Sequence, residues 1–229
     1  MNRRPMKQRC FFLFCATLPF ALALRAQTAE QNPTIPIITF DRLWEAFTPQ
    51  EVTITVQSSG TATYLSRNPL KPPDGETDPD YTLNFTMSAS NRDKLFRYAK
   101  DVNYFNGEFS FKKHVVSSTG KKTLTFADPV RHFETTYDYS ENKAIQEITN
   151  IFSGISNTIE LGRKLQFLRR YDKLGLEAEL KGMETALESH NLAELQLIAP
   201  LLENIANDPA ILNIARQRDR RILAKSAAE

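Results

Sequence analysis

The chain is short of cysteine: its 229 residues include only Cys10 and Cys15. Both lie in the first 26 residues, which read as a removable export signal. Without that stretch the chain has no thiol, which excludes disulfides, cysteine nucleophiles, iron–sulfur clusters and thiolate zinc sites. Burial of the core alone must then stabilise the exported form, and about 203 residues are enough for one large domain or two small ones.

Glycine, long apolar runs and excess positive charge are scarce as well. The 8 glycines form no phosphate-binding loop and no Gly-x-Ser-x-Gly nucleophile motif. Beyond residue 26 no run approaches 18 apolar residues, so we expect no transmembrane helix in the exported form. Five of the 29 basic residues and none of the 27 acidic residues lie in residues 1–26, which leaves 24 against 27 and a net charge near −3. This balance lacks the basic footprint of a nucleic-acid-binding protein.

Residues 1–26 have the pattern of a secretory signal peptide. Four basic residues between Arg3 and Arg9 precede the apolar run Cys10–Leu24, and Ala26 follows. As a helix this run rises only about 22 Å, short of a roughly 30 Å hydrocarbon core. We therefore predict cleavage after Ala26 and a secreted or periplasmic bacterial protein. A lipoprotein anchor is disfavoured by Phe14 before Cys15, and a twin-arginine signal by the residues after Arg4.

Residues 27–140 are expected to form a β-rich α+β domain, because apolar and polar residues alternate along them. The alternating stretches are 52–57, 61–65, 81–87, 109–111, 123–126 and 133–139. Residues 37–47 are a dense apolar cluster expected to dock onto this domain. Ser90 and Asp93 resemble a capping box for one helix, whose apolar stripe from Leu95 to Phe105 is expected to lie across the sheet.

Residues 141–229 show only helical periodicity, and we expect a C-terminal helical bundle. A long helix is predicted over about 142–173 and a second over 176–189. A third spans 192–205 with a kink at Pro200, and a fourth opens with Asp208 as N-cap and Pro209 as its first residue. The fold class is therefore α+β: a mostly antiparallel sheet of five or six strands with one crossing helix, followed by helices.

Two resemblances accompany this pattern. The run from Leu195 to Leu223, with its apolar first helix, Asp208-Pro209 and arginine-rich second helix, resembles a single HEAT-type helix pair. The stretches 155–160 (Ile-Ser-Asn-Thr-Ile-Glu) and 171–176 (Tyr-Asp-Lys-Leu-Gly-Leu) are similar to an uncharacterised family of secreted bacterial proteins. This family resemblance implies the same order of strands and then helices, and no activity.

No catalytic constellation stands out, and we expect no cofactor and no metal. His132 and Glu134 share one face of a predicted strand, but no second histidine stands at ligand spacing. Ser110 and Ser118 each precede a lysine by three residues, an offset that points the two side chains of a strand to opposite faces. The proline-rich, acidic segment 66–80 reads as a long loop, either functional or mobile.

One basic cluster lies at the C-terminus: Arg216, Arg218, Arg220, Arg221 and Lys225. It suits either the solvated end of a last helix, where cations offset the helix dipole, or an interaction with an acidic partner or lipid headgroups.

The first functional hypothesis is an exported, non-enzymatic protein that binds another exported or envelope protein or assists envelope assembly. The alternatives are an inhibitor of secreted peptidases that presents the loop within 66–80, and an enzyme of unrecognised type.

Overall fold

The computed structural model describes residues 33–69, 79–112 and 119–226. The predicted signal peptide, most of the acidic loop within 66–80, and His114 lie outside the described residues. Export therefore stays a prediction.

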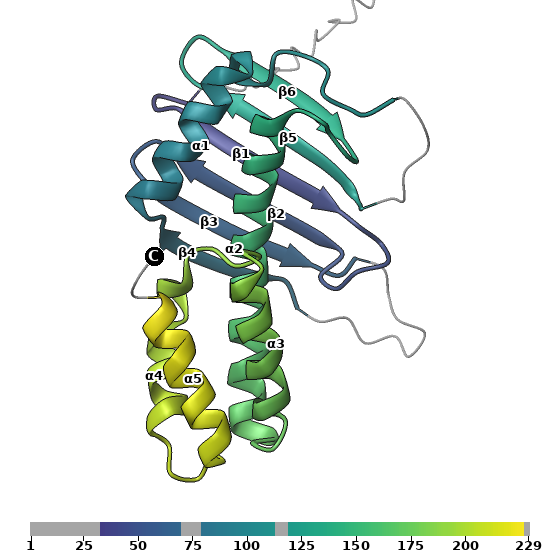
Figure 1. The fold of residues 1–229 in the computed structure, drawn as a ribbon. Coiled ribbons are helices and arrows are strands. Elements are labelled where there is room, and N and C mark those ends of the chain that lie inside the picture. The colour runs from purple at the N-terminus through teal and green to yellow at the C-terminus, as the bar shows by residue number, and fades with distance from the viewer. Residues whose placement is uncertain (1–32, 70–78, 113–118, 227–229) are drawn as a thin grey trace, which may run out of the picture. The chain divides into compact units, whose positions relative to one another are not determined.

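Six strands form one sheet in the order β4-β3-β2-β1-β5-β6, and all five strand pairs are antiparallel. The strands are β1 (Ile37–Leu43), β2 (Glu51–Gln57), β3 (Thr61–Arg67), β4 (Tyr81–Thr86), β5 (Lys121–Ala127) and β6 (His132–Tyr137). The sheet is followed by helices, which confirms the predicted α+β fold (Figure 1).

Two strand predictions were wrong. One strand was missed and another was predicted where none forms, so the number of strands still agrees. Residues 37–43, expected only to dock onto the domain, form β1 in the centre of the sheet between β2 and β5. Residues 109–111 form no strand; the N–H of Phe111 donates a hydrogen bond of 2.8 Å to the carbonyl of Tyr139. Period-2 spacing over three residues is too short to distinguish a strand from an extended loop.

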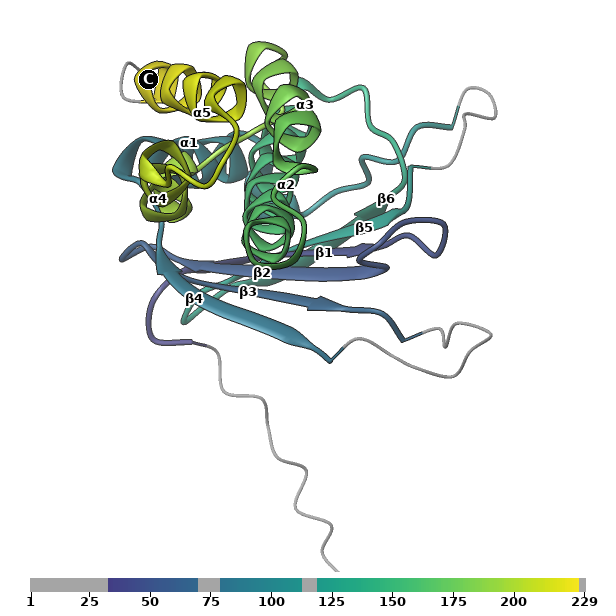
Figure 2. The same cartoon turned by 90° about the horizontal axis from the view of Figure 1, so that it is seen from below.

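The helices of the described ranges lie on one and the same face of the sheet (Figure 2). Helices α1 (Ala89–Asp101) and α2 (Lys143–Tyr171) lie on it, and Phe40 of β1 stacks on Phe152 of α2 with ring centroids 5.0 Å apart. Alternate strand residues point into this first core, among them Ile38, Ile54 and Tyr64. The other face is rich in threonine, as expected where one face of an antiparallel sheet meets water.

Helix α1 begins two residues earlier than its expected capping box. Ser88 is the N-cap, and its hydroxyl accepts a hydrogen bond of 3.3 Å from the N–H of Asn91. Ser90 lies inside the helix, so the prediction of Ser90 as the cap was wrong. A 3-10 turn, η1 (Asn103–Phe105), follows the helix before Asn106-Gly107.

The C-terminal elements pack around a second core. They are α3 (Leu176–Glu188), η2 (Leu195–Leu197), α4 (Ala199–Asn207) and α5 (Asn213–Ser226). Helix α2 serves both cores, because Ile145 to Ile159 belong to the first and Leu165 to the second. Its lower half extends past the sheet and forms a helical bundle with α3, α4 and α5 (Figure 1).

The predicted bounds of α2 and α3 are confirmed to within about two residues, whereas those of α4 and α5 are not. Pro200 occupies the first turn of α4 rather than a kink inside a longer helix, because the chain before it forms η2. Asp208 is the C-cap of α4, and α5 starts only at Asn213. Asp208 instead closes the turn, where its carboxylate accepts from the N–H of Ala210 at 2.9 Å.

None of the helices in the described ranges is long and apolar enough to cross a membrane.

Candidate binding groove

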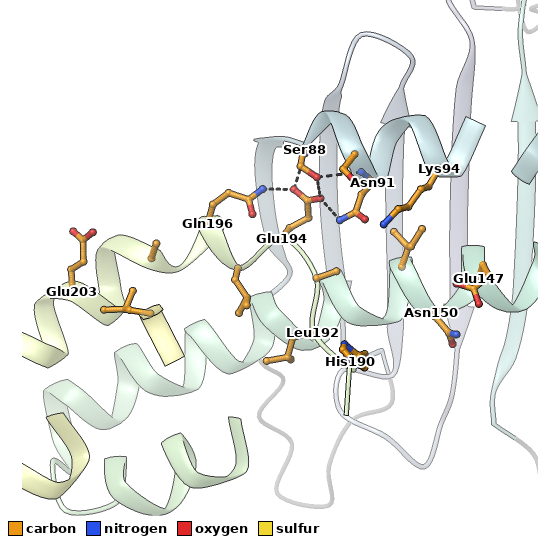
Figure 3. A pocket seen from close by; sticks show the side chains of 16 residues that line it. Ser88, Asn91, Lys94, Glu147, Asn150, His190, Leu192, Glu194, Gln196 and Glu203 are labelled. Carbon is orange, nitrogen blue, oxygen red and sulfur yellow. Dashed lines mark hydrogen bonds between the residues drawn. The ribbon is translucent and has the colours of Figure 1, made fainter. Parts of the chain in front are cut away.

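A groove of about 1020 Å³ lies where the sheet-packed helices meet the C-terminal helices (Figure 3). Its walls come from the start of α1, the first half of α2, the segment that joins α3 to α4, and the facing sides of α4 and α5. Both halves of the chain therefore contribute to it.

The apolar and the polar side chains that line the groove differ in how deeply they are buried. Its apolar side chains are buried or half-buried: Ile151, Leu192, Ala193, Leu195, Ala199 and Leu223. Polar side chains that are exposed surround them: Ser90, Lys94, Glu147, Asn150, His190, Gln196 and Glu203. The groove thus has an apolar floor and a polar rim, the arrangement found in protein–protein interfaces.

The side chain of Glu194 connects two walls of the groove, the α3–α4 segment and the N-terminus of α1. Its carboxylate accepts hydrogen bonds from the Ser88 N–H (2.8 Å) and hydroxyl (2.7 Å), from the Asn91 amide (2.7 Å), and from the Gln196 amide (Figure 3). The side chain is buried, with 4 % of its surface exposed. These donors offset the cost of burying the Glu194 carboxylate, and the positive end of the α1 helix dipole stabilises it further.

The backbone places Glu194 there by a left-handed turn and close helix contacts. Glu194 has a φ of +59°, uncommon for a residue other than glycine. Two glycines of α2 let the α3–α4 segment approach: a Cβ on Gly154 would come within 3.0 Å of Ala193, and one on Gly162 within 2.5 Å of Ile198. The hydroxyl of Thr158 accepts from the N–H of Ala193 at 3.3 Å.

The rim offers charges of both signs without a catalytic arrangement. Lys94 lies on α1, while Glu147 and Glu203 lie on α2 and α4. The imidazole of His190 makes no hydrogen bond to a serine or a carboxylate in the described part of the chain. Nor do the described residues hold any group of three or more histidine, cysteine or acidic side chains suited to a metal. The groove can offer hydrophobic contact and charge pairing.

The C-terminal basic residues lie on α5, and most of them face α3. The Arg218 guanidinium pairs with Glu177 at 3.1 Å and with Glu184, Arg221 pairs with Glu184 at 2.9 Å, and Lys225 with Glu188 at 2.7 Å. Hydrogen bonds from Arg221 and then Arg218 lower the pKa of Glu184 to about 2.

Two members of the basic cluster have other surroundings. Arg220 donates to the carbonyl of Ala206 at 2.9 Å. Arg216 is half-buried, and its Nε has no hydrogen-bond partner among the described residues. The cluster thus ties α5 to α3 and α4, and an interaction with lipid or an acidic partner stays a prediction.

The other residues considered from the sequence lie at three separate places in the fold. His132 and Glu134 are exposed on the edge strand β6, and His190 follows α3 with a φ of +54°. Ser110 lies in a loop, and its partner Lys113 is outside the described residues. Of the other pair, Lys121 begins β5 and Ser118 is outside the described residues.

Glu194 was not found from the sequence, and no local signal marks it. The sequence around it reads Asn-Leu-Ala-Glu-Leu-Gln, an ordinary helical pattern. Its role depends on Ser88, which lies 106 residues earlier in the chain.

No model of a protein family matches this chain, and no match is found among curated proteins.

Proposed function

We propose that this chain is an exported, non-enzymatic protein that binds a polypeptide segment of another exported or envelope protein in the groove between α1, α2 and the α3–α4 segment. The observation that carries the proposal is the apolar floor inside a polar rim. Burial of apolar side chains supplies affinity, and charges at the rim select orientation and partner.

The shape and charge of the groove support a polypeptide over a small molecule. At about 1020 Å³ it is at the upper limit of small-molecule sites, which are mostly enclosed, whereas here the rim side chains are exposed. The rim carries Lys94 on one side and Glu147 and Glu203 on the others. These charges suit a segment that has both an acidic and a basic residue beside apolar ones.

The experiment combines a peptide library with one blocking variant and a matched control. A displayed library of random peptides of about 12 residues is selected on the exported chain. Asn150→Trp places an indole in the groove from an exposed position of α2, and Gln166→Trp places the same ring on the same helix outside the groove.

We expect enriched peptides with apolar residues flanked by charge. Asn150→Trp should weaken their binding by roughly ten-fold or more, and Gln166→Trp by less than about two-fold. A library that yields no binder, or two variants that weaken binding equally, would overturn the proposal.

The alternatives have less support. The peptidase-inhibitor hypothesis depends on a loop of which residues 70–78 lie outside the described residues. Deletion of residues 68–79 followed by peptidase assays tests it directly. The enzyme hypothesis would need a nucleophile beside a base. The Ser88 hydroxyl does donate to the Glu194 carboxylate at 2.7 Å, but this hydroxyl also caps α1, and the carboxylate also accepts from the Asn91 and Gln196 amides.

A further inference from the structure

Two turns lie side by side at the end of the helical bundle farthest from the sheet (Figure 1). One joins α2 to α3 over residues 172–175, and the other joins α4 to α5 over residues 208–212. The ammonium group of Lys173 and the carboxylate of Asp208 connect them at 3.0 Å.

Exposed apolar side chains gather at these turns. We call them the apolar tip: Phe167, Tyr171, Leu174, Leu212 and Ile214. They are 47 to 72 % exposed and make up five of the ten large apolar side chains exposed in the described residues. The Phe167 and Tyr171 rings lie 4.9 Å apart on successive turns of α2. Exposed apolar side chains gathered in this way indicate a surface that contacts something else.

The tip is basic, whereas the molecule is not. Residues 167–175 and 207–216 contain four basic side chains and two acidic ones: Arg169, Arg170, Lys173 and Arg216 against Asp172 and Asp208. The Arg170 guanidinium lies 5.2 Å from the centroid of the Tyr171 ring. The rest of the expected exported form is therefore net negative, because its total charge is near −3.

We propose that the apolar tip docks this protein on the surface of an anionic lipid bilayer. Aromatic rings beside arginine and lysine are the composition of the membrane interface, where apolar parts enter the acyl boundary and cations meet phosphate. A second copy is disfavoured as the occupant, because two tips of the same positive charge would repel one another. This inference does not depend on the groove.

The test is flotation of the exported chain with vesicles of about 70 % phosphatidylcholine and 30 % phosphatidylglycerol. We expect co-flotation at low salt, less on pure phosphatidylcholine, and less at high salt because the charge contribution is screened. The double variant Phe167→Ser, Tyr171→Ser should bind at least about ten-fold more weakly, since both rings leave the interface. Val130→Ser is the control, because Val130 is 81 % exposed in the turn between β5 and β6.

A fluorescence reporter separates docking from misfolding of the double variant. Trp44, the only tryptophan of the chain, follows β1 and is replaced by Phe. Tyr171→Trp in that background should shift its emission to the blue on anionic vesicles, whereas Val130→Trp should not.

Three outcomes would overturn the inference. In the first, the wild-type chain stays at the bottom of the gradient with every vesicle. In the second, Val130→Ser loses as much binding as the double variant. In the third, the tip tryptophan responds only to raised protein concentration, which would assign the tip to self-association.

Discussion

Asp219 is a buried carboxylate without a full set of partners. It lies on α5 with no exposed surface, and neither oxygen has a hydrogen-bond partner among the described residues. Burial raises its pKa from 3.8 to about 7, and the nearby Ala206 N–H and Arg220 guanidinium offset this only in part. The side chain is therefore protonated in the folded protein under mildly acidic conditions.

The stability of the protein should fall as the pH rises from about 4 to above 7. In that window the folded state holds a proton that the unfolded state has released, so unfolding becomes easier with each step in pH. Asp219→Asn should remove this dependence, which amounts to on the order of 4 kcal/mol at most. Urea denaturation at about pH 5 and pH 8 measures it. An equal pH dependence in the variant would contradict the assignment.

Glu194 should contribute more to stability than the cap residue that it contacts. Glu194→Gln removes the negative charge at the N-terminus of α1 and replaces one acceptor by a donor. We expect a loss of on the order of 2 to 3 kcal/mol, against about 1 kcal/mol for Ser88→Ala. Because the two side chains share hydrogen bonds, the double variant should lose less than the sum. Urea denaturation of all three variants measures the coupling, and strictly additive losses would exclude it.

Among the elements, helix α2 contains glycines that close contacts require, whereas α3 contains one that meets no neighbour. A Cβ at Gly162 would lie 2.5 Å from the Ile198 Cγ2, whereas a Cβ at Gly182 would meet nothing within 4 Å. Gly182→Ala should stabilise the protein by about 0.5 to 1 kcal/mol, because alanine favours the helix. Gly162→Ala should destabilise it by about 1 to 3 kcal/mol, because Ile198 has to move. Thermal unfolding compares the two, and equal shifts of the midpoint would contradict the close contact.

Long periodic elements were predictable from the sequence, while their ends and some strands were not. The apolar spacing of α2 from Ile145 to Leu168, over about six turns, left no competing interpretation. Strand β1 was missed because Ile37 and Ile38 are adjacent, so the alternation begins only within the strand. Asp208-Pro209 has the pattern of a helix start, but the carboxylate bonds to Lys173 and Ala210 instead.

The groove was beyond prediction, because its lining comes from five elements spread over residues 88–223. No local pattern brings Ser88 to Glu194. Such a site depends on how the elements pack, and a single sequence provides their periodicity but not their packing.

For the molecule as a whole, α2 couples the two cores. Its first part packs with Phe40 and Ile54 of the sheet, and its last part with Leu180 and Leu202 of the helical bundle. A break between the cores would require breaking a continuous helix of 29 residues. We therefore expect one cooperative unfolding transition.

Two signals can follow that transition separately. The fluorescence of Trp44 reports on the end of the sheet, and far-UV circular dichroism reports mostly on the helices. Their urea curves should coincide, and Leu202→Ala, in the second core, should shift both by the same amount and cost about 2 to 5 kcal/mol. Curves that separate in the variant would show that the cores unfold independently.

The Ser88–Glu194 contact also has a consequence for the order of events during synthesis of the chain. The chain emerges from its N-terminus, and Glu194 follows Ser88 by 106 residues. The start of α1 therefore lacks the Glu194 carboxylate until a further 106 residues have been made. A nascent chain that stops before residue 194 leaves those amide and hydroxyl donors to water.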